Sequence, residues 1–496
     1  MRHARRSAFP WSRTDTLALT LITIFGGLLR FVRLASPKGF VFDETYYAKD
    51  ACLYLGLGQS YCRLDQATEQ SYVHPPLGKW LIAIGERLFG YNEFGWRVAS
   101  AVVGTALIVV IYLLARKLFH HRWIAGAAAL LTATDFLLLV QSRIAMLDIF
   151  QSFFVALGFL FLAYDRADVI RWRSEALLPF PAPPRVRELE WRFAAGASFG
   201  LALGVKWSAA WALIGAASLA AIWSISLIRA GSRLPGPKKR GLWEALALVI
   251  ALGVIPVAAY LSSYTKYFVD TASVECPYRG PKESEYGRKP VDRSKPATDL
   301  GRINFGVQTD QCKSGPYGVA LAFIDLQGRM ANYHLTLNAT HAYKSSAASW
   351  PIVRRPVAYY FESKPEDSQI LAFGNPAVWW AALAGALLLL SRSLRPRAFQ
   401  PERVVAVAWA SQYLPWLAVT RPLFFFYMTP VAPFMMIGLA VALEKLRSLG
   451  RGPRWLVTTY FAIGVMALLW YFYPVIAAVG LRPDLWRSRM WFRSWI

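Results

Sequence analysis

The sequence is poor in acidic residues, histidine and cysteine, and it lacks the loops that bind nucleotides. Lys and Arg number 55 against 30 Asp and Glu, with His 6 and Cys 4. No P-loop, no G-x-G-x-x-G fingerprint, no internal repeat and no Cys/His spacing typical of a zinc site occurs. We therefore expect no soluble nucleotide-binding domain, no metal and no cofactor. Any activated substrate has to arrive by another route, and the membrane is the obvious one.

Apolar residues are abundant instead. They make up 55% of the 496 residues, and the mean hydropathy is +0.32. A transmembrane helix needs roughly 20 apolar residues, and several stretches qualify. The first, Thr16 to Phe31, has no small-residue cleavage site after it and ends in Arg30 to Arg33, so we interpret it as a retained helix. The sequence predicts an all-α polytopic membrane protein.

We expect about eleven membrane spans. Their ranges are 16–34, 98–116, 124–140, 146–164, 193–206, 208–229, 242–261, 376–391, 404–419, 423–443 and 455–479.

The net charge of +25 follows the membrane topology. Basic residues gather at the N-terminus (Arg2, Arg5, Arg6, Arg13) and in the connections 165–192, 229–241, 392–403 and 444–454. With eleven spans these segments all face the cytoplasm, as the positive-inside rule requires. The N-terminus is then cytoplasmic and the C-terminus extracytoplasmic. This interpretation is better than nucleic-acid binding, since no soluble segment shows a basic groove with interleaved aromatic residues.

Two long loops then face outward, 35–97 and 262–375, within a single membrane domain 1–496. All four cysteines lie in them: Cys52 and Cys62 in the first, Cys276 and Cys312 in the second. Thiols confined to one side of a membrane indicate an oxidising compartment. Four cysteines allow three pairings, of which the two within-loop pairs are the simplest.

The first outer loop contains the acids that we expect to carry chemistry. Asp43 and Glu44 stand just outside the first span, in an aromatic setting with Tyr47. Adjacent carboxylates repel, and burial raises their pKa, so one of them could serve as a general base. The alternative is a solvated acidic pair. Farther along the loop, two prolines separate His74 from Lys79, which would fix the direction of both side chains. The alternative, which is the better one for this motif taken alone, is a helix that starts with proline near its first turn.

Cations at the ends of spans form a second group of candidates. By the topology above they lie at or near the outer boundary, against the positive-inside trend, and such charges are costly unless they are paired. Snorkelling anchors are the alternative. Together they suggest a phosphate site, to which Arg and Lys are suited. The residues are Arg30, Arg97, Arg143, Lys206 and Arg421.

The segment from 332 to 356 holds the remaining candidates. His334 and His341 lie seven residues apart and would share a helical face if the segment is helical. They are too few ligands to indicate a metal, so substrate or phosphate contact is the better interpretation. Trp350 follows in Ser349-Trp350-Pro351.

These motifs together resemble the protein O-mannosyltransferases of actinobacterial type. The family has an Asp-Glu pair in the first outer loop, then H-P-P-x-x-K, then F-G-Y-N-x-F-G-W-R. Here these are Asp43-Glu44, His74 to Lys79 and Phe89 to Arg97. The similarity runs over nearly the whole chain. The second loop lacks the β-trefoil domain of eukaryotic members, and His341-Ala342-Tyr343 replaces the family's His-Pro-Tyr.

The resemblance implies a GT-C fold in the cell membrane and an inverting, metal-independent reaction. The donor is a polyprenyl-phosphate-mannose, and the acceptor is a Ser or Thr hydroxyl of a secreted or membrane polypeptide met at the Sec translocon. It makes Asp43 the general base, with Glu44 holding the acceptor or tuning Asp43. The donor phosphate is assigned to Arg30, Lys79, Arg97, Arg143 and Lys206, and further donor or acceptor contacts to Tyr47, His74, His341, Trp350 and Arg421.

Two other functions fit the composition. A lipid-linked sugar transferase acting on a lipid or glycan, such as an aminoarabinose transferase, would share the fold and the outer-loop acid, but the H-P-P and F-G-W-R motifs disfavour it. A transporter would also have many spans with intramembrane charges, yet it would favour broken helices in symmetric halves, and no such symmetry is visible.

Overall fold

The computed structural model describes residues 10–63, 72–175, 190–231, 237–280, 311–337, 341–363, 365–394 and 400–496. Several basic residues used for the expected topology lie outside these ranges, namely Arg2, Arg5, Arg6, Arg185, Arg187 and Arg233.

The described chain is helical almost throughout. The α-helices are α1 (Arg13–Phe31), α2 (Glu44–Tyr54), α3 (Leu77–Phe89), α4 (Glu93–Phe119), α5 (Arg122–Thr134), α6 (Phe136–Gln141), α7 (Asp148–Glu175), α8 (Glu190–Val205), α9 (Ala209–Gly231), α10 (Pro237–Val249), α11 (Ile255–Ser262), α12 (Thr265–Ala272), α13 (Gly315–Thr336), α14 (Pro376–Ser393), α15 (Pro401–Tyr413), α16 (Ala432–Arg447), α17 (Arg451–Thr459), α18 (Leu468–Ile476) and α19 (Pro483–Arg489). Short 3-10 or π segments are η3 (Ile250–Val254), η5 (Ala347–Ser349), η6 (Leu414–Ala418), η7 (Phe425–Met428), η8 (Tyr460–Ala467) and η9 (Arg493–Trp495).

Seven of the described helices are long and apolar enough to cross a membrane. They confirm the polytopic membrane class. Their ranges are Arg13–Phe31, Glu93–Phe119, Asp148–Ala167, Ala209–Ser226, Trp243–Ser262, Pro376–Ser393 and Arg451–Ile476.

The other four expected spans coincide with shorter or interrupted helices. The range 124–140 is divided into α5 and α6 at Asp135, whose carboxylate accepts a hydrogen bond from Leu138 N and so starts a new helix. The range 193–206 is α8. The range 404–419 ends in η6, and 423–443 begins with η7 before α16. The count of eleven spans therefore stays a prediction.

Local caps set where the helices of the site begin. The Ser12 hydroxyl accepts from Asp15 N, and the Asp15 carboxylate accepts from Ser12 N, which starts α1 with a capping box. Asn92 accepts from Gly95 N, so α4 begins at Glu93, before the expected start of the span at 98.

One element departs from an all-α fold. Strands β1 (Val357–Glu362) and β2 (Ser368–Ala372) form an antiparallel pair in the second loop, with Val357 opposite Ala372 and Glu362 opposite Ser368. Buried residues (Val357, Tyr359) alternate with partly buried ones (Ala358, Tyr360) at the start of β1, as in a strand with one face on the core.

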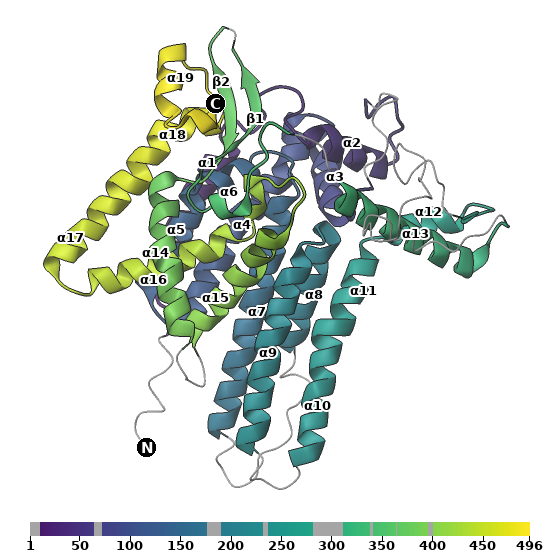
Figure 1. Ribbon diagram of the computed structural model, residues 1–496, viewed down its shortest axis with the longest axis horizontal. Coiled ribbons are helices and arrows are strands. Elements are labelled where there is room, and N and C mark those ends of the chain that lie inside the picture. Colours follow the sequence, from purple (N-terminus) through teal and green to yellow (C-terminus); the bar gives the residue numbers. More distant parts are fainter. Residues whose placement is uncertain are drawn as a thin grey trace.

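The loop elements gather at one end of the helices. In Figure 1, α2, α3, the β1–β2 pair and α19 lie toward the upper end of the molecule with the C-terminus beside α19, and α12 and α13 project to the right from the upper end of α11. The long helices α7, α9 and α10 to α11 extend away from them toward the opposite end. Both expected outer loops therefore meet at the same end of the helices.

Candidate functional site

The segment before α2 places Asp43 at the junction of the two loops. Phe42 has φ +52°, a left-handed conformation that is uncommon for a residue other than glycine. Its ring stacks on Tyr359 of β1 with the centroids 4.4 Å apart. This contact joins the first loop to the second and compensates for backbone strain directly beside the acid.

Glu44 holds the same segment in place through hydrogen bonds within the protein. It is fully buried, and both carboxylate oxygens are occupied. Oε1 accepts from Arg97 Nε at 2.8 Å and from Ala145 N at 2.9 Å, while Oε2 accepts from Arg97 Nη2 and Val41 N, each at 2.8 Å. Four hydrogen bonds fill the acceptor sites of a carboxylate, so Glu44 has none left for an acceptor substrate.

Arg97 is equally occupied. Besides its two bonds to Glu44, it donates to the carbonyls of Leu34, Pro37 and Gly39 at 3.2, 2.8 and 3.0 Å. These five bonds use all five N–H donors of a guanidinium. Arg97 therefore fixes the backbone between α1 and α2 and has no donor left for a phosphate.

Asp43, in contrast, is half-buried, and within the described part of the chain its carboxylate accepts a side-chain hydrogen bond from the Tyr47 hydroxyl at 3.3 Å. Burial raises the pKa of Asp43 to about 6, with a further increase from the charge of Asp148, while Lys206 and the Tyr47 bond oppose the shift. A carboxyl that titrates near neutral pH and has free acceptor capacity is suited to take up a proton.

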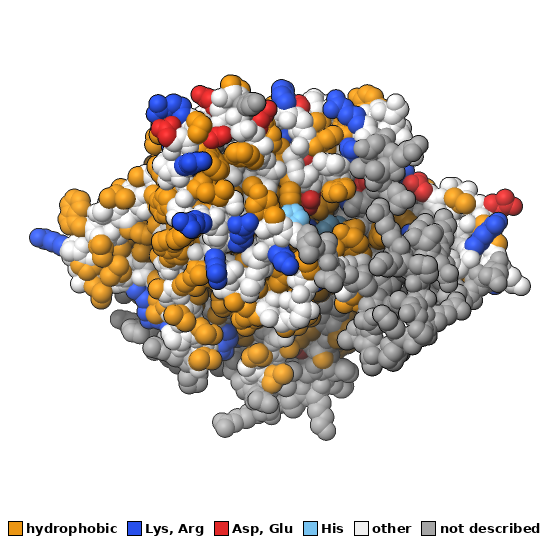
Figure 2. All heavy atoms as spheres, turned by 45° about the horizontal axis from the view of Figure 1, so that its top comes forward, with side chains coloured by type: hydrophobic (Ala, Val, Ile, Leu, Met, Phe, Trp, Pro, Cys, Tyr) orange, Lys and Arg blue, Asp and Glu red, His pale blue; other side chains and the backbone are white. Residues whose placement is uncertain are grey.

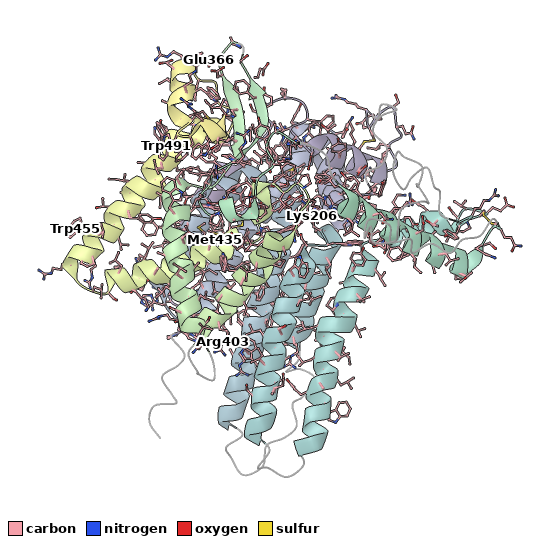
Figure 3. All side chains as sticks on the ribbon, viewed as in Figure 1. Lys206, Glu366, Arg403, Met435, Trp455 and Trp491 are labelled. Carbon is pink, nitrogen blue, oxygen red and sulfur yellow. A yellow bond between two sulfur atoms is a disulfide. The ribbon has the colours of Figure 1, made fainter. Side chains whose placement is uncertain are left out.

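Lys206 and Asp148 form an ion pair next to Asp43. The distance from Lys206 Nζ to Asp148 Oδ2 is 2.8 Å, and both side chains are nearly inaccessible. Lys206 follows the end of α8 and Asp148 begins α7, and Figure 3 shows Lys206 at the ends of the long helices, below the loops. Lys206 also lies 5.7 Å from the centroid of the Phe426 ring.

Several further residues near Asp43 are absent from the site residues predicted from the sequence. Asp148 is the most informative, because an acid at the start of an apolar run already signals function in a membrane protein. The others are aromatic. Tyr359 and Tyr333 lie close enough to Asp43 to interact with its charge. Tyr427 likewise lies close to both of these tyrosines. No periodic or local signal in the sequence distinguishes these tyrosines from ordinary interfacial ones.

Two imidazoles stand beside the acid. The ring of His74 lies 6.1 Å from Tyr47 and 5.5 Å from His334 of α13. Burial lowers the pKa of His334 to about 4 and that of His74 well below its usual range, and the cations Lys206 and Arg421 add to both shifts. Both rings are therefore neutral at neutral pH. His334 Nε2 lies 3.0 Å from the carbonyl of Val73, which can only accept a hydrogen bond, so this nitrogen carries the proton.

Arg421 completes the ring of groups. Its Nη1 lies 3.2 Å from the Tyr427 hydroxyl, and its guanidinium lies over the rings of Trp416 and Tyr427. Trp350 is fully buried behind Tyr427 and donates to Ser345 Oγ at 2.9 Å. His341 is exposed and packs edge-on against Phe424. It lies outside α13, which ends at Thr336, so the condition for a helical face shared with His334 is not met.

The remaining nominated cations are bound elsewhere. Lys79 forms a buried ion pair with Asp50 at 2.8 Å. Arg30 donates to the carbonyls of Gly26, Ala133 and Thr132. Arg143 donates to the carbonyls of residues 29, 30, 32 and 33, at the end of α1. These side chains hold neighbouring segments together. Of the five cations that the resemblance assigns to phosphate, only Lys206 lies close enough to Asp43 to lower its pKa.

Both loops contain a disulfide. Cys52 of α2 is bonded to Cys62, and Cys276 to Cys312, which are the two within-loop pairs. The first bond holds the end of α2, and with it the helix that Asp43 begins.

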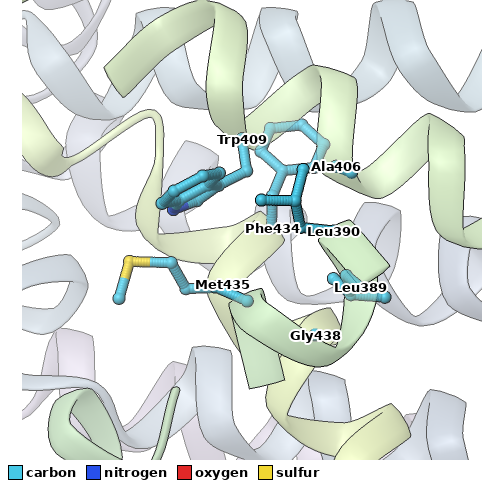
Figure 4. A pocket seen from close by; sticks show the side chains of 8 residues that line it. Leu389, Leu390, Ala406, Trp409, Phe434, Met435 and Gly438 are labelled. Atoms are coloured by element: carbon cyan, nitrogen blue, oxygen red, sulfur yellow. The ribbon is translucent and has the colours of Figure 1, made fainter. Parts of the chain in front are cut away.

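Figure 2 shows the face that carries the loops, where histidine and acidic side chains emerge among hydrophobic ones near its middle. Within the described residues, no group of three or more His, Cys, Asp or Glu could hold a metal. An apolar pocket lies apart from this site, between α14, α15 and α16, and Figure 4 shows Met435, Phe434, Trp409 and Leu389 lining it. The polar cluster, where the ionisable acid Asp43 lies near Lys206 and the two histidines lie near Arg421, is the candidate site.

Comparison with known proteins agrees with this geometry. The family model described as dolichyl-phosphate-mannose-protein mannosyltransferase matches residues 20–270, and that of the C-terminal four TMM region of protein-O-mannosyltransferase matches residues 320–495. The solved structure of the S. cerevisiae protein O-mannosyltransferase Pmt1-Pmt2 complex bound to the sugar donor superposes with a TM-score of 0.72 at 17% identity, over 98% of this chain and 93% of that chain. The fold and site therefore define a polytopic glycosyltransferase of the GT-C class.

Sequence relatives give the family. The polyprenol-phosphate-mannose–protein mannosyltransferase of Mycobacterium tuberculosis is 30% identical over 96% of this chain and 91% of its own length. The undecaprenyl phosphate-alpha-4-amino-4-deoxy-L-arabinose arabinosyl transferase of Pseudomonas aeruginosa is 36% identical, but over only 32% of this chain. The chain belongs to the protein O-mannosyltransferase family.

Proposed function

We propose that this enzyme transfers mannose from a polyprenyl-phosphate-mannose donor to Ser or Thr hydroxyls of polypeptides on the extracytoplasmic side of the cell membrane. The observation that carries the proposal is the setting of Asp43. Its carboxyl is half-buried, its pKa is raised to about 6, and it adjoins the Lys206–Asp148 pair at the end of the helices where the two loops meet. Full-length similarity to a protein mannosyltransferase supports a polypeptide acceptor over a lipid or glycan.

The reaction divides between the acid and the cations. Asp43 accepts the proton of the acceptor hydroxyl while the hydroxyl oxygen attacks the anomeric carbon of mannose. The bond from that carbon to the phosphate oxygen breaks, its electron pair leaves with the polyprenyl phosphate, and the sugar is inverted. Lys206 and Arg421 stabilise the phosphate charge, an effect that is often the largest in catalysis. Each of these steps is assigned to side chains of this protein.

This assignment separates the adjacent acids of the first loop. Asp43 acts on the substrate, whereas Glu44 and Arg97 position it, because their hydrogen-bonding capacity is filled within the protein. Lys79, Arg30 and Arg143 likewise hold the scaffold. The residues proposed to contact the donor phosphate are then Lys206 and Arg421. His74, His341 and Trp350 are proposed to lie near or behind the bound acceptor.

The substitution Asp43→Asn tests the proposal. Asn keeps the shape but accepts no proton, so transfer of labelled mannose from lipid donor to a Ser/Thr peptide should fall by about a hundred- to ten-thousand-fold. Thermal stability should be unchanged or higher, because the ionised Asp43 is disfavoured by burial. Asp270→Asn, on the exposed part of α12, is the matched control and should retain activity. Activity of Asp43→Asn within a few-fold of wild type would refute the base assignment.

A further inference from the structure

A patch of exposed apolar and basic side chains lies beside the second loop, outside the site described above. Ile352 is 50% exposed, Trp380 42%, Trp491 41% and Phe492 43%. These side chains are not buried in the core of the protein. Four large apolar side chains exposed together indicate an interaction surface.

Contacts between three chain segments hold this patch together. The Trp380 indole N–H donates to the carbonyl of Ile352 at 3.1 Å, and the Trp380 and Phe492 rings lie 6.4 Å apart. Trp491 stacks on Trp495, whose indole donates to the carbonyl of Val353 at 2.9 Å. The patch is therefore one built surface and not a set of scattered side chains.

Two arginines flank the apolar groups. Arg354 and Arg493 are exposed, and the hydroxyl of Ser494 donates to the carbonyl of Arg354, which brings the two segments together. Neither 341–356 nor 485–496 contains an acidic residue. Positive charge at this end of the molecule runs against the positive-inside trend, and an anionic partner would compensate it.

The apolar part of the patch continues a surface that faces lipid. Helix α14 is a candidate membrane span, and its exposed residues Trp380, Ala384, Leu387 and Leu390 follow one helical face. Trp380 lies at the end of that stripe nearest the loops, where an aromatic belt meets the lipid headgroups. Figure 3 shows Trp491 on the same side of the molecule, beside α18. The bilayer that covers the α14 stripe therefore reaches the patch.

We propose that this patch is an anionic-lipid anchor at the outer boundary of the membrane. Trp380, Trp491, Phe492 and Ile352 enter the headgroup region, and Arg354 with Arg493 binds lipid phosphate. Because Val353 and Arg354 belong to the loop that carries His341 and Trp350, the anchor holds this loop against the bilayer next to the site. The proposal goes beyond the transfer reaction and does not depend on it.

The test measures lipid binding and not turnover. The full-length protein is reconstituted in phosphatidylcholine with spin-labelled phosphatidylglycerol, and the motionally restricted lipid fraction is measured by electron paramagnetic resonance. Each arginine near a charged surface contributes about fivefold. The double variant Arg354→Gln/Arg493→Gln should therefore lose most of the phosphatidylglycerol preference, roughly 25-fold if the two contributions multiply. The control Lys38→Gln/Arg482→Gln removes the same charge from exposed sites outside the patch and should keep the preference.

Two results would overturn the proposal. One is an unchanged phosphatidylglycerol preference in the Arg354/Arg493 variant, including the case in which that variant weakens binding of an acidic acceptor peptide instead. The other is a wild-type protein that is a dimer in light scattering and becomes a monomer in the Arg354/Arg493 variant with lipid preference intact, which would show that a second copy covers the patch. Circular dichroism of the variant, which alters only exposed side chains, should match wild type.

Discussion

At the scale of single residues, the site depends on which charged groups keep a free hydrogen-bonding position. Asp43 keeps one and Glu44 does not, although they are adjacent in the chain. The two neighbouring carboxylates thus have different surroundings, because Glu44 points into a cluster of hydrogen-bond donors and Asp43 points toward Tyr47 and the Lys206–Asp148 pair.

The pH dependence of transfer should report the pKa of Asp43. Asp43 must be ionised to accept a proton, so the rate should rise with pH through about 6 and then level off. Lys206 lowers the pKa of Asp43 and Asp148 raises it. Lys206→Met should therefore move the acidic limb to higher pH, and Asp148→Asn should move it to lower pH. The measurement is the pH profile of kcat/KM for each variant, and shifts in the same direction would contradict the assignment.

Glu44→Gln should act through folding. It leaves the buried Arg97 without its counter-charge, a loss that typically costs about 3–5 kcal/mol of folding free energy. We expect a lower midpoint of thermal unfolding in detergent and faster proteolysis, in contrast to Asp43→Asn. The double variant Glu44→Gln/Arg97→Gln should be less destabilised than the two single losses added together, because the pair is coupled. Additive losses would show that the pair does not act as a unit.

At the scale of elements, close helix packing positions the first loop. A Cβ atom on Gly85 of α3 would lie 2.3 Å from the carbonyl oxygen of Gly95 in α4, and one on Gly95 would lie 1.9 Å from that of Gly90. Backbone atoms cannot move aside as a flexible side chain can. The absence of side chains at these positions therefore lets α3, which carries Lys79, approach α4, which carries Arg97.

Gly85→Ala should destabilise the protein by about 1–3 kcal/mol, since an extra methyl group must force α3 away from α4. Gly126→Ala in α5 is the matched control, because a Cβ there meets nothing within 4 Å. Ala is also the better helix former, so the control should be neutral or stabilising. The measurement is the thermal unfolding midpoint of both variants in the same detergent, and equal midpoints would contradict the packing argument.

The β1–β2 pair is a regular element that the polar sequence of the second loop does not predict. The sequence of the second loop is polar and predicts no regular structure. The β1–β2 pair nevertheless contains Tyr359, which stacks on Phe42 and accepts a hydrogen bond from Gln141. An isolated two-stranded pair is marginally stable in water. Here packing against α6 and α18 supports it, as does the Trp486 indole bond to Gln369. Such support cannot be inferred from local sequence.

At the scale of the whole molecule, the two disulfide-containing loops meet at one end of the helices (Figure 1). We predict that this end is extracytoplasmic. On intact cells, a membrane-impermeant maleimide should label the cysteines only after treatment with an impermeant reductant. Labelling that requires permeabilisation of the cells would place the loops, and the proposed site, on the cytoplasmic side.

The sequence by itself determined the membrane class and the family resemblance, and it predicted Asp43 as the acid. These depend on local information, because the transfer of about 20 apolar residues into a bilayer is fixed by their composition. Only the tertiary structure decided which cations keep hydrogen-bond donors that could bind a phosphate. Arg97 reaches Glu44 and Arg143 reaches the end of α1 across long stretches of chain, and such hydrogen bonds leave no periodic trace in the sequence. The Lys206–Asp148 pair likewise forms only when α7 and α8 pack side by side.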